Sequence, residues 1–394
     1  YIKIKGIKME NQIENLKGDQ KLIEEKIKNL YEYFLSNKDY SDLHIKTNTY
    51  PRLRCNADIK TLQDFDILDT KFMEYLVAKI FRDKFNETAE KEFKNFLNYG
   101  TEADFAIDLP NSDFRARLNI AKSMGEIKIT YRKIPNDMPL LETLNIRSNH
   151  LEIIRKIMSL KEGLVLITGQ TGSGKSTTLA SIINEINQEK TKHIVTIEHP
   201  VEFRHKDIKS LITHREVGEK SDTKSFSDGL RAAVRQDPDI IMVGEMRDAE
   251  TALAALQAAQ TGHLVFATLH TNSAPETVVR VLDLFPPEKA DSIRVSLAES
   301  LKLIISQKLV PTVDNKRVLS YECLFVNNNI KNAISSDKIN FVNTIKESMN
   351  TNYKEGMLTM NRSLKLLLDE GKITKEMALE YSNDSKELEE LLED

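Results

Sequence analysis

The segment 169–176 reads Gly-Gln-Thr-Gly-Ser-Gly-Lys-Ser and constrains the fold more than any other part of the sequence. It matches the pattern G-x-x-x-x-G-K-[ST], in which a glycine-rich turn follows a strand and opens a helix. An apolar run at 163–168 precedes it, and a helical pattern starts near Lys175. Glycines let backbone N–H groups face a phosphate without an intervening Cβ, and the helix N-terminus adds partial positive charge. The segment therefore predicts a phosphate-binding loop in an α/β fold.

Two side chains of this loop carry its chemistry. Lys175 places a cation on the β- and γ-phosphate oxygens of ATP, and the Ser176 hydroxyl is suited to ligate Mg²⁺. ATP and Mg²⁺ are therefore the predicted cofactors. The residues predicted to bind the nucleotide are Gly169, Gln170, Thr171, Gly172, Ser173, Gly174, Lys175, Ser176 and Thr177.

Apolar strand patterns alternate with helical patterns in the sequence around this loop. The strands are predicted at 163–168, 193–198, 210–214, 239–244 and 263–269, and the helices at 174–187, 225–235, 249–260 and 288–306. This alternation indicates a parallel sheet with helices on both faces. The predicted fold class of this part is α/β.

The rest of the chain divides into smaller parts. Period-two alternation between 39 and 134, interrupted by one helix at about 70–86, indicates a small α+β domain of antiparallel strands. Pro135 and Pro139 mark the connection that follows it. The predicted domains are a helical leader at 1–38, the α+β domain at 39–134, a linker at 135–148, the ATPase core at 149–326 and a helical C-terminal subdomain at 327–394.

Three carboxylates lie at the ends of predicted strands. The strand 239–244 leads into Glu245, and ligands of parallel sheets bind beyond the carboxyl ends of the strands. Glu245 is therefore predicted to hold a metal-associated water. The strand 193–198 delivers Glu198 and, four residues later, Glu202. Either glutamate is suited to orient the attacking water, and the pattern alone does not choose between them.

Two histidines bracket the last predicted strand of the sheet. His270 follows the strand at its carboxyl end, where it is placed to hydrogen-bond a γ-phosphate and report its loss. His263 begins the strand and lies farther from that edge. His270 is therefore the stronger candidate from sequence position alone.

Composition narrows the classes of function. The chain has 394 residues and a net charge of −4, so no overall positive charge draws it to nucleic acid or anionic lipid. Cys55 and Cys323 lie far apart, which excludes a disulfide framework and a four-cysteine zinc site. The apolar runs fall short of the ~18–20 residues that cross a bilayer, so a cytoplasmic protein is predicted.

Four motifs together resemble those of the secretion ATPase superfamily, and most closely its PilT-type branch of type IV pilus retraction (twitching motility) ATPases. They are the phosphate loop, Ile-Glu-His-Pro-Val-Glu at 197–202, Gly-Glu-Met-Arg-Asp at 244–248 and the histidine-containing segment 261–272. Methionine in the third motif is typical of the retraction branch. Extension and type II secretion relatives tend to have isoleucine there, and they commonly carry a four-cysteine metal insertion. The resemblance extends from about Ser41 to the C-terminus.

The resemblance implies a RecA-like P-loop core, a PAS-like N-terminal domain and a homohexameric ring driven by Mg²⁺-dependent ATP hydrolysis. It selects Glu202 as the catalytic glutamate and places Glu245 at the Walker B carboxylate. Arg117 and Arg132 match arginines that reach ATP bound to a neighbouring core. The residues implied to act in catalysis are Glu202, Glu245, Lys175, Arg117, Arg132, His270 and His263, with Ser176 and Glu245 as metal ligands.

The implied function is pilus retraction by a motor at the inner face of the cytoplasmic membrane. Its partners would be an inner-membrane pilus platform protein and, indirectly, the pilin machinery, with no nucleic acid and no transmembrane segment. Two positions depart from the family pattern: His199 replaces the usual aspartate, and 329–331 reads Asn-Ile-Lys instead of Ala-Ile-Arg. The alternatives are a pilus-extension or type II secretion ATPase, a nucleotide-dependent switch with little turnover, and a nucleic-acid motor, which the net charge disfavours.

Overall fold

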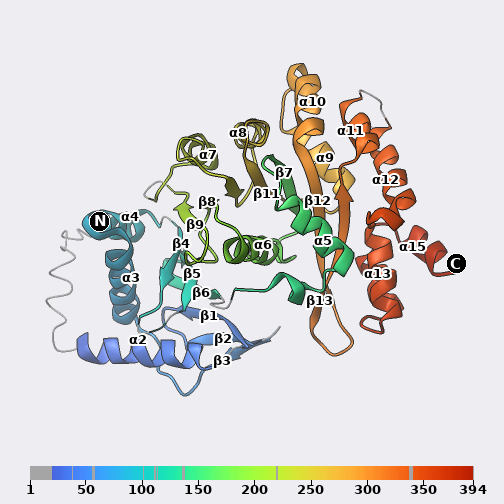
Figure 1. Cartoon of the computed structure of the whole chain (residues 1–394). Coiled ribbons are helices and arrows are strands. Elements are labelled where there is room, and N and C mark those ends of the chain that lie inside the picture. The colour runs from blue at the N-terminus through green and yellow to red at the C-terminus, as the bar shows by residue number, and fades with distance from the viewer. Residues whose placement is uncertain are drawn as a thin grey trace. The chain divides into compact units, whose positions relative to one another are not determined.

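The computed structural model describes residues 20–37, 39–55, 58–100, 102–110, 112, 114–134, 138–218, 221–336 and 340–393. The chain divides into two compact units, Tyr1–Asp137 and Met138–Asp394 (Figure 1). Residues 1–19 and 38 of the predicted leader lie outside the described residues, and so do 135–137 of the predicted linker.

The first unit is built on a six-stranded antiparallel sheet with the strand order β3-β2-β1-β6-β5-β4. Its strands are β1 (Tyr40–Lys46), β2 (Arg52–Cys55), β3 (Asp58–Thr61), β4 (Ala103–Asp108), β5 (Arg115–Ser123) and β6 (Glu126–Ile134). Its helices are α2 (Gln20–Leu35), α3 (Thr70–Phe85) and α4 (Ala89–Tyr99).

One face of this sheet is apolar, because buried and exposed residues alternate along the strands as predicted. Ala116, Leu118 and Ile120 of β5 are fully buried and share one core with all three helices. Within this core the hydroxyls of Tyr31 in α2 and Tyr131 in β6 lie 2.8 Å apart. The helix α2 falls in the predicted leader, yet it packs into the core of the α+β unit.

The second unit contains a seven-stranded sheet with the order β13-β12-β7-β11-β10-β8-β9. Its strands are β7 (Gly163–Thr168), β8 (His193–Glu198), β9 (Leu211–Glu216), β10 (Ile240–Val243), β11 (Leu264–Leu269), β12 (Leu301–Pro311) and β13 (Arg317–Phe325). All neighbouring pairs are parallel except β12 with β13. Every residue of β7 and β11 is buried, which requires cover on both faces.

Helices supply this cover. Their bounds are α5 (Ser148–Ile157), α6 (Lys175–Glu189), α7 (Phe226–Ala233), α8 (Ala249–Gln260), α9 (Ala274–Asp283), α10 (Ala290–Ser300), α11 (Asn328–Ser335) and α12 (Phe341–Thr351). The helices α5 and α6 share a core with one face of the sheet, to which Val165 and Ile167 of β7 point. The helices α7 to α12 share a core with the other face, to which Leu164 and Leu166 point. The predicted α/β core is confirmed.

One predicted helix of the core is wrong in its second half. A helix was predicted at 288–306, but α10 ends at Ser300 and the next residues form β12. An apolar run as short as 301–305 does not distinguish a buried strand from a buried helix by periodicity. The strand form prevails because β12 pairs with both β7 and β13. The helix α9 and the strand β13 were also not predicted.

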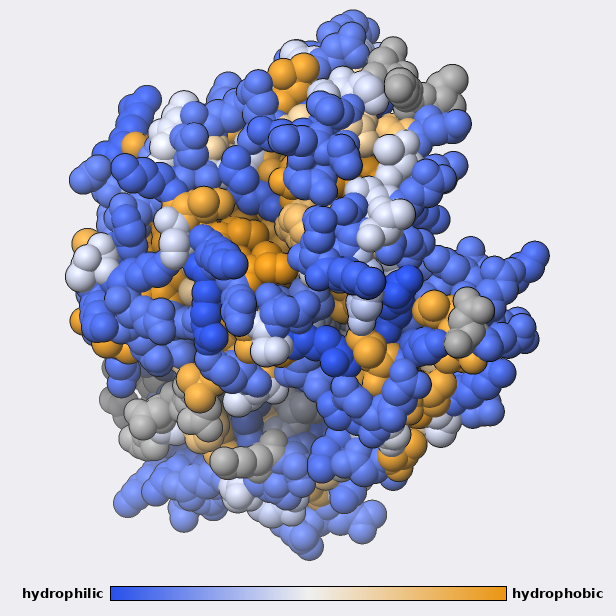
Figure 2. All heavy atoms as spheres, turned by 45° about the vertical axis from the view of Figure 1, so that its right-hand side comes forward, coloured by the Kyte–Doolittle hydropathy of each residue, from blue (hydrophilic) through white to orange (hydrophobic). Residues whose placement is uncertain are grey.

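The C-terminal part is helical, as predicted. The helices α13 (Met360–Asp369), α14 (Lys375–Tyr381) and α15 (Ser385–Glu393) pack around Leu364, Leu367 and Leu388. In the described parts of the chain, none of the helices combines the length and the apolar character needed to span a membrane. On the face shown in Figure 2 hydrophilic residues predominate, and apolar residues form limited areas between them.

Candidate functional site: a nucleotide site at the carboxyl edge of the second sheet

The phosphate loop has the predicted strand–loop–helix context: β7 ends at Thr168 and α6 begins at Lys175. Gly169, Gly172 and Gly174 have φ values of 142°, 82° and 91°, which side chains with a Cβ rarely adopt. A Cβ at Gly169 would also lie 2.4 Å from the backbone oxygen of Gln307. Glycine is therefore required at position 169 by both conformation and space.

Lys175 lies inside the curve of this loop. Its Nζ donates hydrogen bonds to the backbone oxygens of Gly169 (2.7 Å) and Gln170 (3.0 Å). Burial lowers the pKa of Lys175, while the carboxylates of Glu245 and Glu202 act in the opposite direction. The loop, the lysine and two of the predicted catalytic carboxylates thus belong to one electrostatic site.

Glu245 and His270 meet at the ends of neighbouring strands. Glu245 follows β10, and its Oε1 lies 3.1 Å from Nε2 of His270, which follows β11; it also forms an ion pair with Arg247. Burial lowers the pKa of His270, and the nearby charge of Lys175 lowers it further. The hydroxyl of Thr268 donates to the backbone oxygen of Gly244 at 2.5 Å and joins the two strand ends. Thr268 was not predicted as a site residue.

Glu198 and Glu202 have different surroundings, which the sequence pattern did not reveal. Glu198 is buried at the end of β8, with its Oε1 3.8 Å from Nδ1 of His214. Glu202 is half-buried in the loop after β8 and acts electrostatically on Lys175. Of these two glutamates, Glu202 is therefore the one that acts on the lysine of the phosphate loop.

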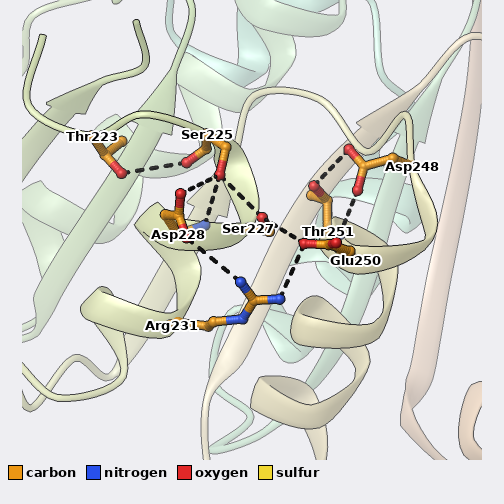
Figure 3. A network of polar contacts seen from close by, with 8 residues as sticks. All are labelled: Thr223, Ser225, Ser227, Asp228, Arg231, Asp248, Glu250 and Thr251. Atoms are coloured by element: carbon orange, nitrogen blue, oxygen red, sulfur yellow. Dashed lines mark hydrogen bonds and ion pairs between the residues drawn. The ribbon is translucent and has the colours of Figure 1, made fainter. Parts of the chain in front are cut away.

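A network of polar contacts fixes the helix that follows Glu245 (Figure 3). Asp248 caps α8 by accepting hydrogen bonds from the backbone N–H (2.8 Å) and the hydroxyl (2.9 Å) of Thr251. Arg231 of α7 donates to Glu250 of α8 at 3.2 Å. The Arg231–Glu250 contact ties α7 to α8, and the Asp248 cap fixes the start of α8 three residues after Glu245. The capping role of Asp248 was not predicted, although an aspartate directly before a helical pattern is its usual signal.

His263 is not brought to this site within the same chain. It lies at the amino end of β11, where its Nδ1 is 3.1 Å from the backbone oxygen of Ala258. Its own backbone oxygen accepts a hydrogen bond from Gly163, the first residue of β7. The six residues of β11 separate it from His270, a distance of about 23 Å for seven steps at ~3.3 Å per residue. A catalytic role for His263 stays a prediction and does not rest on contact with this nucleotide site.

Arg117 and Arg132 belong to the first unit and lie beside one another on β5 and β6. Arg117 binds both carboxylate oxygens of Asp104, at 3.0 and 2.7 Å. The Nε of Arg132 donates to Asp42 at 2.9 Å, and 67% of the Arg132 side chain is exposed. Both guanidinium groups are thus held on the polar face of the sheet, on the side away from the helices.

A cavity of about 460 Å³ opens beside the phosphate loop. Gly174, Thr177 and Thr178 line it from the loop and α6, and Leu309 and Val318 line it from β12 and β13. This volume lies in the range of sites for small-molecule ligands. The cavity therefore offers space for the part of a nucleotide that extends beyond its phosphates.

The comparisons with known proteins agree with this geometry. The family model described as type II/IV secretion system protein matches residues 17–372. The type IV pilus retraction ATPase PilT of Pseudomonas aeruginosa is 40% identical over 78% of this chain and 84% of its own length. The twitching motility protein of Neisseria gonorrhoeae is 47% identical over 62% of this chain and 64% of its own length.

A solved structure gives the same result. The crystal structure of the pilus retraction motor PilT with bound ADP has a TM-score of 0.76 and 41% identity, over 89% of this chain and 95% of that one. This confirms the predicted fold class, with its RecA-like P-loop core, and the resemblance stated from the four motifs. The chain belongs to the type II/IV secretion system protein family and is a P-loop ATPase of its pilus-retraction type.

Proposed function

We propose that this chain hydrolyses ATP with Mg²⁺ as the homohexameric motor of type IV pilus retraction, on the cytoplasmic side of the inner membrane. One observation carries the proposal: Lys175, Glu202, Glu245 and His270 gather at the phosphate loop. The similarity to two proteins named for pilus retraction and twitching motility supports the biological role. The partner proposed at the membrane is the pilus platform protein, through which the motor acts on the pilin machinery.

In the proposed reaction the backbone N–H groups of 169–176 and Lys175 bind the β- and γ-phosphates. Glu202 accepts a proton from a water molecule as that water attacks the γ-phosphorus. The bond between the γ-phosphorus and the bridging oxygen breaks, so ADP and phosphate are formed. His270, held beside Glu245, is placed to respond when the γ-phosphate departs.

Mg²⁺ fits the residues at this edge of the sheet, because it is a hard cation that takes oxygen ligands. Ser176 presents an exposed hydroxyl in the first turn of α6, and Glu245 presents a carboxylate at the end of β10. These two residues are the proposed metal ligands. When bound, the ion would neutralise negative charge on the β- and γ-phosphate oxygens.

Arg117 and Arg132 are the proposed link between neighbouring subunits of the ring. A guanidinium that arrives from an adjacent subunit stabilises the charge of the transition state only when the subunits close, so hydrolysis is tied to movement. Its planar fork suits two phosphate oxygens at once. The carboxylates of Asp104 and Asp42 hold the two side chains on one face of their sheet.

The substitution Glu202→Gln tests the assignment of the catalytic glutamate. It should lower kcat by at least about 100-fold, because an amide does not accept the proton from the attacking water. The affinity for ATP should change little. Phosphate release and ATP binding are measured on the full chain, with Glu198→Gln as the matched control. Wild-type kcat in a folded Glu202→Gln variant would overturn the assignment, and a loss confined to Glu198→Gln would transfer it to Glu198.

Deletion of the gene separates retraction from the extension and secretion alternatives. Loss of a retraction motor leaves surface pili present or more numerous and abolishes twitching, whereas loss of an extension motor removes the pili. Electron microscopy of surface pili together with a twitching assay gives the answer. Cells without pili after the deletion would assign this chain to extension.

A further inference from the structure

The loop that carries Glu202 is held mainly by side chains. Residues 199–210 join β8 to β9 without forming a helix or a strand. Val201, Phe203 and His205 are buried, whereas Glu202 is half-buried and Arg204 is exposed. This alternation turns Glu202 away from the interior, so the position of its carboxylate depends on what anchors the buried positions on either side.

His214 of β9 anchors the middle of this loop. Its Nε2 lies 3.1 Å from the backbone nitrogen and 3.3 Å from the backbone oxygen of His205. Its Nδ1 lies 2.9 Å from the hydroxyl of Thr196 in β8. The 3.1 Å contact requires the tautomer of His214 that carries its proton on Nδ1. In this tautomer Nε2 accepts from the His205 N–H, and Nδ1 donates to the hydroxyl of Thr196. The ring also stacks on that of His205, with centroids 5.8 Å apart and planes 12° from parallel.

Asn187 anchors the second half of the loop. Its Nδ2 donates to the backbone oxygen of Lys206 at 2.7 Å, and its Oδ1 accepts from the backbone N–H groups of Ile208 (3.1 Å) and Ser210 (3.3 Å). Its backbone oxygen accepts from Lys209 at 2.9 Å. Only 1% of Asn187 is exposed. One buried amide therefore satisfies three backbone groups of a segment that has no regular structure of its own.

Asn187 lies on the same helix as the phosphate-binding lysine. The helix α6 starts at Lys175 and ends at Glu189, so Asn187 is in its last turn. At ~1.5 Å rise per residue, about 18 Å of rigid helix connects the two residues. The helix that presents its N-terminus to the phosphates thus also fixes the far end of the loop that presents Glu202.

We infer that Asn187 and His214 are positioning residues that hold the loop 199–210 so that Glu202 faces Lys175. The inference rests on the proposed catalytic role of Glu202. Neither residue touches the nucleotide in this assignment, and both act through the backbone of the loop. The expected result of removing either one is a slower chemical step with nucleotide binding preserved.

The first test is His214→Ala in the full chain. It should lower kcat about 10- to 100-fold, since misplacing a catalytic group by about 1 Å is enough for such a loss. The Kd for ADP should stay within about twofold. The variant His214→Gln should restore most of the turnover, because its amide both donates and accepts as the imidazole does. His193→Ala is the matched control: His193 begins β8 at the opposite edge of the sheet and should leave kcat unchanged.

The second test is Asn187→Ala, with Asn184→Ala as its control. Asn184 is buried on the same helix, and its Oδ1 accepts from Gln188 of α6 instead of contacting the loop. Asn187→Ala should lower kcat by a similar factor and speed amide exchange in 201–210 but not in 169–180. Asn184→Ala should do neither.

Two further measurements separate failure of the inference from failure of the proposed function. Glu202→Gln with wild-type turnover would remove the catalytic role on which the inference rests. Glu202→Gln without turnover, combined with wild-type kcat in folded His214→Ala and Asn187→Ala, would overturn the inference alone. In the double variant Glu202→Gln/His214→Ala the second change should not lower the residual rate further, because both act on one group.

Discussion

The loop 199–210 starts at the edge of the sheet where the phosphate loop lies and returns to the opposite edge at β9, and the two loops have their shapes fixed by different means. Three glycines with positive φ and the start of α6 shape the phosphate loop. Side chains from β9 and α6 shape the loop 199–210. The shape of the phosphate loop depends on its own residues, which are proposed to bind the nucleotide. The shape of the loop 199–210 depends on buried residues that are not proposed to contact the nucleotide. Substitutions should therefore affect binding in one loop and turnover in the other.

The largest effect is expected at the phosphate loop. Gly169→Ala should weaken ATP affinity by at least about 100-fold, or ~2.7 kcal/mol. Its Cβ would meet the backbone of Gln307, which has no freedom to withdraw, and φ is 142°. Gly262→Ala is the matched control, because φ there is 92° but open space surrounds the new Cβ. Titration calorimetry measures both affinities. Equal affinity in the two variants would show that glycine geometry does not define the phosphate loop.

An intermediate effect is expected at the two ends of β11. His270→Ala should lower kcat about 10- to 100-fold, because His270 contacts Glu245 beside Lys175. His263→Ala should leave the Kd for ATP unchanged, since His263 lies at the opposite edge of the sheet. Steady-state phosphate release and nucleotide titration distinguish the two. Weakened ATP binding in His263→Ala would show that the nucleotide site is not confined to the carboxyl edge of the sheet.

The smallest effect is expected on the free energy of unfolding when the pH is lowered. Burial lowers the pKa of His205 from 6.5 to about 4, and the neighbouring His214 contributes to the lowering. Below pH 6.5 the unfolded chain therefore binds a proton at this site that the folded chain does not bind. The stability that His205 contributes is present above pH 6.5 and is lost as the pH falls toward 4, by about 1 kcal/mol at pH 5.5.

The comparison for this prediction is His205→Phe, which keeps a buried ring but does not titrate. Burial also lowers the pKa of His150 to about 4, so only the difference between wild type and the His205→Phe variant reports on His205. Urea unfolding at pH 7.5 and 5.5 measures this difference, and amide exchange of 201–210 shows whether the loss is local. An identical pH dependence in both proteins would contradict the assignment.

The same contrast explains how much of the molecule the sequence predicted. The phosphate loop, its strand and its helix follow from local signals, since glycine conformation and apolar periodicity act over neighbouring residues. Glu245 and His270 follow from the rule that sites form at the carboxyl edge of a parallel sheet. The choice of Glu202 over Glu198 needed the family resemblance and stays a prediction.

The features that were missed depend on contacts between distant residues. The sequence pattern predicts a helix over 301–306, the first half of β12, because the pairing of this strand with β7 is invisible in a short apolar run. Asn187 and His214 are polar residues whose partners come from the fold and not from any spacing in the sequence. Arg117 and Arg132 were found only through the resemblance, and the cross-strand register that places them side by side came from the structure.

In the proposed function the loop 169–176 holds a triphosphate whose terminal bond is broken with the help of Lys175. The most direct test is phosphate release by the full chain as a function of ATP concentration, in wild type and in Lys175→Ala. Wild type should show saturable turnover, and a folded Lys175→Ala variant should lose at least about 100-fold of it. Equal turnover in the two proteins would contradict the proposed role of Lys175.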